Sequence, residues 1–201
     1  ETADGEAMVH HDAALGRLTE DTAHLATMTA AALKQIAFKV ADERMITLGE
    51  LCELVAGRVP LIVELKSRYE ADITLVRRVV EVLRGYAGPV AVMSFDPRQV
   101  RALRALAPGL PRGIVAQRRY DHPEWERLSP AQRRSMTHLL HAFSTQPHFV
   151  AYRVQDLPAP APQLARYFFG LPLLTWTVRT PEERARAARW ASQMIFEGFK
   201  P

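Results

Sequence analysis

The sequence predicts an α/β fold in which buried parallel strands alternate with helices. From residue 60 onward short apolar runs alternate with longer amphipathic ones, and the apolar runs are nearly continuous. Such strands are typical of parallel sheets covered by helices on both faces. Of the 201 residues, 48% are apolar, and no linker composition interrupts the chain. We therefore expect one domain spanning residues 1–201.

The first elements are predicted from turn and capping signals. An Asp4-Gly5 pair precedes an apolar run, which predicts a hairpin and a strand over 6–11. Helices are expected over 29–34 and 47–55, the second because Thr47 and Glu50 form a capping-box pattern. An apolar run predicts a strand over 60–66, and amphipathic spacing predicts a helix over 72–84.

The remaining chain continues the same alternation. Pro97 occupies a favoured first-turn position of the helix over 97–106. After the Arg-rich stretch 118–130, a helix is expected through Phe143, and another over 163–168 follows a Pro-rich loop. The further expected strands are 90–95, 113–117, 149–154, 173–178 and 194–196, and the last helix is 181–191.

About six β/α units fit this pattern. A full (β/α)₈ barrel takes about 250 residues, so a TIM-barrel-type chain of this length is short by one or two units. A doubly wound open sheet is the competing architecture, although no Gly-rich phosphate loop follows any strand. The alternation of strands and helices alone does not distinguish a TIM barrel from a doubly wound sheet.

Composition narrows the classes of partner. Lys and Arg number 26 against 22 acidic residues, giving a net charge of +4 spread along the chain, so we expect no nucleic acid partner. A basic surface binding nucleic acid or anionic lipid, built on Arg118, Arg119, Arg133 and Arg134, is kept as a minor hypothesis. No apolar run is long enough to cross a bilayer. The single cysteine, Cys52, excludes an internal disulfide and is expected to be a small buried hydrophobe.

Polar and aromatic residues gather where the predicted strands end. Glu64 and Lys66 alternate on one strand, so both side chains point the same way and could bind a cation and a phosphate; the alternative is a buried ion pair between neighbouring strands. His11 suits proton transfer, or is a surface hairpin histidine. Trp176 is either a core residue or the wall of a ligand pocket. His138 and His141 have no third ligand in view and are expected on a helix surface.

Taken together, several stretches resemble the glycerophosphodiester phosphodiesterase family. They occur in the family's order along essentially the whole chain. The matching stretches are Thr2-Ala3-Asp4-Gly5, Met8-Val9-His10-His11-Asp12, Leu15-Gly16-Arg17, Ile46-Thr47-Leu48-Gly49-Glu50-Leu51, Leu61-Ile62-Val63-Glu64-Leu65-Lys66, Ser94-Phe95-Asp96-Pro97, Thr175-Trp176-Thr177-Val178 and Thr180-Pro181-Glu182-Glu183.

The resemblance implies a (β/α)₈ TIM barrel, incomplete at its N-terminus, that hydrolyses glycerophosphodiesters to glycerol 3-phosphate and an alcohol. It implies that His11 is a catalytic acid/base and that Lys66 lies near the phosphate. Phe95 and Trp176 would wall the glycerol end of the pocket. Glu64 would be a ligand of a divalent metal, Ca²⁺ or Mg²⁺. The implied partner is a small-molecule glycerophosphodiester, and the expected location is the cytoplasm.

The chain departs from the family pattern in three places. It begins Glu1-Thr2-Ala3, so the family's His-Arg-Gly histidine and a Glu/Asp pair expected just upstream of Thr2 are not in it. Its last strand reads Ile195-Phe196-Glu197, where many relatives have Ile-Thr-Asp, and Glu197 is a candidate replacement. These departures keep an alternative open, a non-catalytic barrel that binds a phosphorylated ligand.

Overall fold

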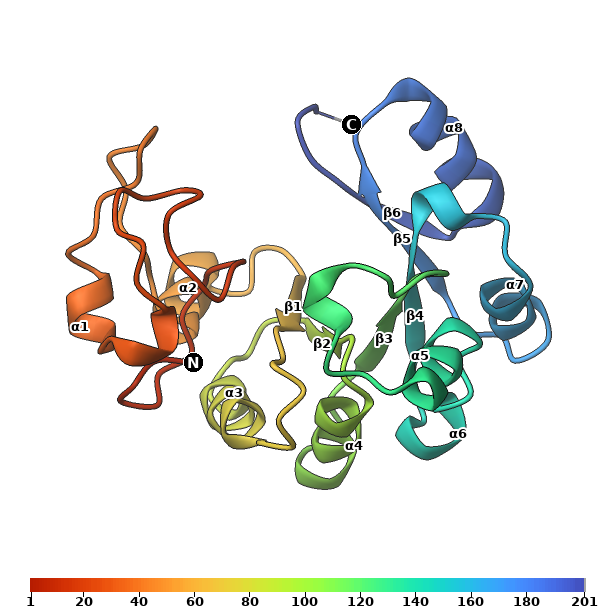
Figure 1. The fold of residues 1–201 in the computed structure, drawn as a ribbon, viewed down its shortest axis with the longest axis horizontal. Coiled ribbons are helices and arrows are strands. Elements are labelled where there is room, and N and C mark those ends of the chain that lie inside the picture. The colour runs from red at the N-terminus through yellow and green to blue at the C-terminus, as the bar shows by residue number, and fades with distance from the viewer. Residues whose placement is uncertain (201) are drawn as a thin grey trace. The chain divides into compact units, whose positions relative to one another are not determined.

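A computed structural model describes residues 1–200, and the chain divides into two compact units (Figure 1). The N-terminal unit comprises Glu1–Lys66 and Ala71–Val90. The C-terminal unit comprises Ser67–Glu70 and the chain from Ala91 onward. The single-domain organisation expected from the sequence stays a prediction.

The N-terminal unit contains one strand and four helical segments. These are the 3₁₀ helix η1 (Leu25–Thr27), α1 (Ala30–Leu33), α2 (Leu48–Val55), β1 (Leu61–Leu65) and α3 (Thr74–Arg84). Its core is a cluster of Leu15, Leu25, Leu33 and Met45. Strand β1 begins where the Leu61 N–H donates to the Pro89 carbonyl (2.9 Å).

The strand predicted over 6–11 is wrong. A single antiparallel bridge pairs Met8 with Thr47, and residues 1–24 contain no named strand. Asp4 and Gly5 do form a turn, in which the Gly5 N–H donates to Thr2 O (3.1 Å). However, the Asp4 carboxylate accepts from the distant Ala30 N–H (3.0 Å) and starts no hairpin. The Asp4-Gly5 turn therefore places the Asp4 carboxylate for a contact with a residue distant in sequence.

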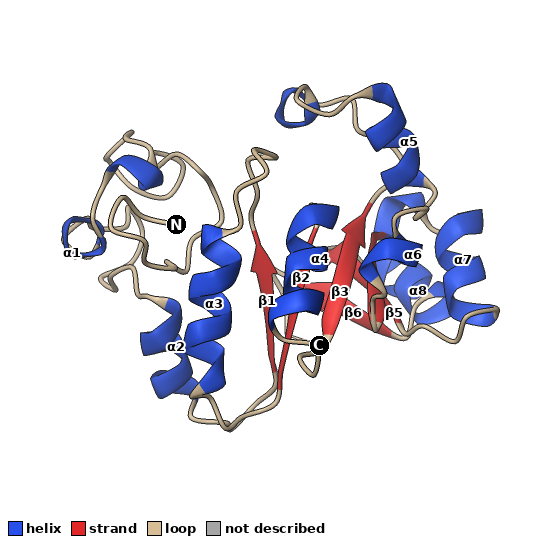
Figure 2. Cartoon of the chain, turned by 90° about the horizontal axis from the view of Figure 1, so that it is seen from below, coloured by secondary structure: helices blue, strands red, loops and turns tan. Residues whose placement is uncertain are grey.

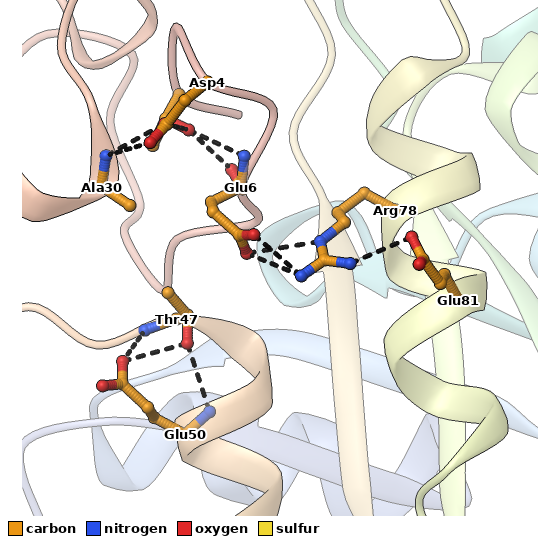
Figure 3. Close-up of polar contacts among 8 residues, drawn as sticks. Asp4, Glu6, Ala30, Thr47, Glu50, Arg78 and Glu81 are labelled. Atoms are coloured by element: carbon orange, nitrogen blue, oxygen red, sulfur yellow. Dashed lines mark hydrogen bonds and ion pairs between the residues drawn. The ribbon is translucent and has the colours of Figure 1, made fainter.

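Two polar arrangements fix this unit (Figure 3). The predicted capping box of α2 is confirmed: Thr47 Oγ1 accepts from the Glu50 N–H (3.2 Å), and Glu50 Oε2 accepts from the Thr47 N–H (2.8 Å). Arg78 on α3 donates to both carboxylate oxygens of Glu6 and to Glu81 (2.9 Å). The Glu6 contact ties the irregular N-terminal segment to a helix.

The C-terminal unit is a parallel β/α arrangement (Figure 2). Strands β2 to β6 lie in chain order, and the pairs Val92–Arg112, Gly113–Phe149, Val150–Leu173 and Leu174–Gln193 set their register. The strands are β2 (Val90–Ser94), β3 (Arg112–Ala116), β4 (Phe149–Arg153), β5 (Leu173–Val178) and β6 (Gln193–Phe196). The helices are α4 (Pro97–Leu106), α5 (Pro130–Thr137), α6 (Ala142–Thr145), α7 (Pro160–Tyr167) and α8 (Pro181–Trp190), with 3₁₀ turns η2 (Pro123–Trp125) and η3 (Val154–Asp156).

Both faces of this sheet are buried, which explains the nearly continuous apolar strands. Successive residues of a strand join different clusters: Ile114 lies in one with Val150, and Val115 in another with Ala151. The cluster with Ile114 also contains residues of the covering helices. The buried members of the cluster with Val115 all come from strands, and Phe95 and Trp176 pack against its edge. Close packing here requires Gly113, because a Cβ atom would lie 2.2 Å from the Phe149 ring.

The helix predicted through Phe143 is interrupted. It ends at Thr137, Leu139 adopts a positive φ of 56°, and a new short helix begins at Ala142. This break turns His141 inward, where it is 7% exposed, so its predicted surface position is wrong. Burial lowers the pKa of His141 to about 4. Cys52 is buried, as predicted.

Candidate active site

Three of the predicted site residues meet at the end of β1. Lys66 Nζ lies 2.8 Å from Glu64 Oε1 and 3.1 Å from His11 Nε2. Because Glu64 and Lys66 are two residues apart on extended chain, their side chains share one side, as predicted. The pair is partly exposed, with 24% and 39% of the side chains accessible. It therefore lies at a solvent-facing edge and is not a buried ion pair between strands.

The contacts of His11 assign its tautomer. An ammonium group only donates hydrogen bonds, so His11 Nε2 accepts from Lys66 and carries a lone pair. The ring proton is then on Nδ1, which donates to Asp12 Oδ1 (2.7 Å). Arg17 Nε lies 2.6 Å from the other Asp12 oxygen. The Arg17 hydrogen bond is the main reason that the pKa of Asp12 falls to about 2.

Backbone contacts hold this histidine segment in place. Val9 N–H donates to Ile46 O (2.9 Å), and Leu48 N–H donates to Ala7 O (2.8 Å). His10 Nδ1 lies 2.8 Å from the Asp12 carbonyl oxygen, a contact that turns the chain immediately after His11. Asp12 and Arg17 were present in the motifs that carry the resemblance, but their role as partners of His11 was not predicted.

The C-terminal unit brings the two predicted aromatic residues together. The rings of Phe95 and Trp176 meet edge to face with centroids 5.4 Å apart. The Trp176 indole N–H donates to the Ala151 carbonyl (3.1 Å), which fixes its orientation on β5. Trp125 packs against Phe95 at 5.0 Å and was not predicted, because it lies in a loop whose sequence has no periodicity. The result is an aromatic wall.

A polar network borders the carboxyl ends of β4, β5 and β6 in the same unit. Arg179 pairs with Glu197 (2.6 Å), and its backbone N–H donates to Glu183 (2.7 Å). Gln155 bridges Glu183 and Arg153. The sequence singled out Glu197 as a polar residue at this edge, but a salt bridge to Arg179 had no local signal.

The residues present do not build a site for a hard cation by themselves. Ca²⁺ and Mg²⁺ take six or more oxygen ligands, most of them from carboxylates, carbonyls and water. Among residues 1–200 no group of three or more His, Cys, Asp or Glu side chains is arranged to hold a metal. One oxygen of Glu64 is also engaged by Lys66. The metal-ligand role implied for Glu64 stays a prediction.

Solved structures with the same fold have low sequence identity. A phosphodiesterase from Oleispira antarctica, in complex with the product sn-glycerol-3-phosphate, is 17% identical with a TM-score of 0.77, covering 97% of this chain and 77% of that one. A glycerophosphodiester phosphodiesterase from Thermotoga maritima is 20% identical with a TM-score of 0.70 over 97% and 77%. A Silicibacter pomeroyi protein named as a glycerophosphoryl diester phosphodiesterase is 24% identical with a TM-score of 0.75 over 97% and 76%. These likenesses confirm the barrel type and disfavour the doubly wound alternative.

Sequence comparison gives the family. No curated protein matches the chain. The family model described as "Glycerophosphoryl diester phosphodiesterase family" matches residues 1–199, which is nearly the whole sequence. Together with the barrel-type fold, this match shows that the chain belongs to the glycerophosphoryl diester phosphodiesterase family of phosphodiester hydrolases.

Proposed function

We propose that this protein hydrolyses glycerophosphodiesters to glycerol 3-phosphate and an alcohol. The observation that carries the proposal is the contact between Lys66 Nζ and His11 Nε2 at the end of β1. It puts a cation that can attract a phosphate and a group that can transfer a proton close enough to act on the same phosphodiester. The Oleispira antarctica structure, which holds the product sn-glycerol-3-phosphate, supports the choice of substrate class.

The proposed chemistry begins with a competition for Lys66. A phosphodiester anion attracts the ammonium more strongly than the neutral imidazole does, so substrate binding frees His11 Nε2. Lys66 then offsets the negative charge that develops on the phosphoryl oxygens. His11 Nε2 accepts a proton as the attacking oxygen of water forms its bond to phosphorus. The resulting imidazolium returns a proton to the alcohol oxygen as the old P–O bond breaks.

Asp12 acts through His11 and is a positioning residue. Its carboxylate accepts from His11 Nδ1–H (2.7 Å) in the resting state and faces the imidazolium when that forms. Arg17 and the low pKa of Asp12 keep this carboxylate ionised throughout the neutral range. Phe95 and Trp176 are proposed to pack against the carbon skeleton of the glycerol moiety, a contact suited to an apolar wall.

Dependence on Ca²⁺ or Mg²⁺ is predicted from the resemblance, and no step above is routed through a metal. Chelation tests this prediction directly. Loss of turnover in EDTA, with recovery on adding either ion, would confirm it. Unchanged turnover in EDTA would contradict it.

The decisive assay measures glycerol 3-phosphate released from glycerophosphocholine by the full chain. We expect His11→Gln to lose most of the turnover, whereas His24→Gln, at an exposed histidine of the same unit, keeps it. Equal activities of the two variants would contradict the proposal. Calorimetric binding of glycerol 3-phosphate with no turnover in the wild type would instead support the non-catalytic alternative.

Along residues 1–200 no helix is both long and apolar enough to cross a membrane. The predicted cytoplasmic location is tested by fractionating cells that express the full-length protein.

A further inference from the structure

Four large apolar side chains are exposed together at the end of α7. Leu164 is 55% exposed, Tyr167 68%, Phe168 77% and Phe169 57%. We call these four residues the α7 ridge; α7 is labelled in Figure 1. The opposite face of the helix is accounted for, because Pro162 and Ala165 are buried in the core of the unit. Contiguous exposed aromatic surface of this kind marks an interaction site.

The ridge projects from a helix end. Phe168 and Phe169 follow the last helical residue, and their rings meet edge to face at 5.3 Å. Gly170 then adopts a positive φ of 66° and turns the chain toward β5. Phe168 and Phe169 thus stand on a turn that follows the helix, next to Leu164 and Tyr167 on its last turn.

Two arginines lie beside the ridge. Arg166 places its guanidinium 5.1 Å from the centre of the Tyr167 ring. At the end of α8, Arg189 lies over Trp190, whose carbonyl accepts from Gln163 on α7. A surface that complements this region is therefore negatively charged.

We propose that the α7 ridge docks the protein on an anionic lipid bilayer. Phenylalanine and tyrosine rings favour the boundary between headgroups and acyl chains, and arginines beside them attract anionic lipid phosphates. A lipid surface fits better than a protein partner, because exposed aromatic rings beside Arg166 and Arg189 suit the headgroup region of an anionic bilayer and need no complementary pocket.

Docking in this way leaves the aromatic wall accessible. The ridge precedes β5 and lies at the amino ends of the parallel strands. Phe95 follows β2, and Trp176 lies in the second half of β5, so both belong toward the carboxyl ends. The bilayer would therefore cover one end of the sheet while small molecules in solution reach the other.

The test is co-sedimentation of the full chain with vesicles of phosphatidylglycerol and phosphatidylcholine in equal parts. We expect binding at about 0.05 M salt, much weaker binding at about 0.5 M, and little binding to pure phosphatidylcholine. Changing Phe168→Ser together with Phe169→Ser should weaken binding at least about tenfold. Leu54→Ser, at a 63% exposed apolar residue on α2, is the matched control and should bind like the wild type.

Melting temperature and hydrolysis of glycerophosphocholine should be the same in all three proteins, so a docking defect is separated from misfolding and from failure of the proposed enzymatic function. The proposal is overturned if the wild type does not bind these vesicles or if the control loses as much binding as the double variant. It is also overturned if the double variant changes the oligomeric state in solution and leaves vesicle binding intact, because a second copy would then be the partner.

Discussion

Removing the charge of Lys66 is the sharpest test of the proposed site. The change is Lys66→Met, which keeps most of the side-chain volume. A unit charge about 4 Å from a phosphoryl oxygen contributes about 4 kcal/mol at an effective dielectric of about 20. Since 39% of the Lys66 side chain is exposed, solvent screening reduces this to about 2–3 kcal/mol. We therefore expect kcat/KM to fall by about 30- to 150-fold.

The same variant identifies what Glu64 does. If Glu64 only holds Lys66 in place through the 2.8 Å contact, Glu64→Gln alone should lower kcat/KM by about two- to fivefold, the value of an exposed ion pair. In the Lys66→Met background the same change should then have almost no effect. Initial rates of glycerol 3-phosphate release from the wild type, both single variants and the double variant complete the cycle.

Independent losses would refute this reasoning. If Glu64→Gln lowers kcat/KM as strongly without Lys66 as with it, the carboxylate acts on its own, as a metal ligand would. Lys66→Arg is the matched control, because it keeps the charge and should retain more activity than Lys66→Met. Equal activities of those two variants would show that the charge is not what matters.

Further expected outcomes concern catalysis and the stability of the fold. His11→Gln should lower kcat by about 10²- to 10⁴-fold with an unchanged circular dichroism spectrum. Thr47→Ala should lower the free energy of unfolding by about 1 kcal/mol in urea titrations, because the Glu50 N–H loses its acceptor; no change would contradict the cap. The hydrogen bond from Lys34 is the main reason that the pKa of Glu50 falls from 4.5 to about 2. Ionised Glu50 therefore contributes fully to the free energy of unfolding above about pH 4.5, and this contribution is lost as the pH falls through about 2. Glu50→Gln should abolish this part of the pH dependence. Burial lowers the pKa of His141 from 6.5 to about 4. As the pH is lowered from about 6.5 to about 4, the unfolded chain therefore takes up a proton at this residue before the folded chain does, and the free energy of unfolding falls. The same slope of unfolding free energy against pH in His141→Gln would contradict this.

Much of the fold could be predicted because its signals are local. Helix α4 and strand β5 have the predicted bounds, since Pro97 begins one and a continuous apolar run makes the other. The region before residue 25 could not be predicted in this way. Its backbone pairs with residues distant in sequence, as in the Met8–Thr47 bridge. The position of His141 was missed for a related reason, because the break at Leu139 depends on packing.

The candidate site could be predicted in part. The i, i+2 spacing on a strand requires Glu64 and Lys66 to share a side, and their contact confirms this. The approach of His11 across 55 positions of sequence had no local signal and came only from the family resemblance. Trp125 had neither a local signal nor a match to the family motifs. A loop residue is recognised as part of an aromatic wall only when its neighbours in space are known.

The proposed acid/base residue lies in the least regular part of the chain, and this has a physical consequence. No helix or strand ladder fixes His11, so its position depends on a few long-range contacts: the Val9 and Leu48 backbone hydrogen bonds, and the ion pair of Glu6 with Arg78. Each of these joins the N-terminal segment to a regular element or to the residues that flank one. Proton transfer needs positional precision of a fraction of an ångström. The carboxylate and cation networks around residues 4–17 are therefore best understood as the scaffold of the histidine, in place of a strand ladder such as the one that positions Trp176.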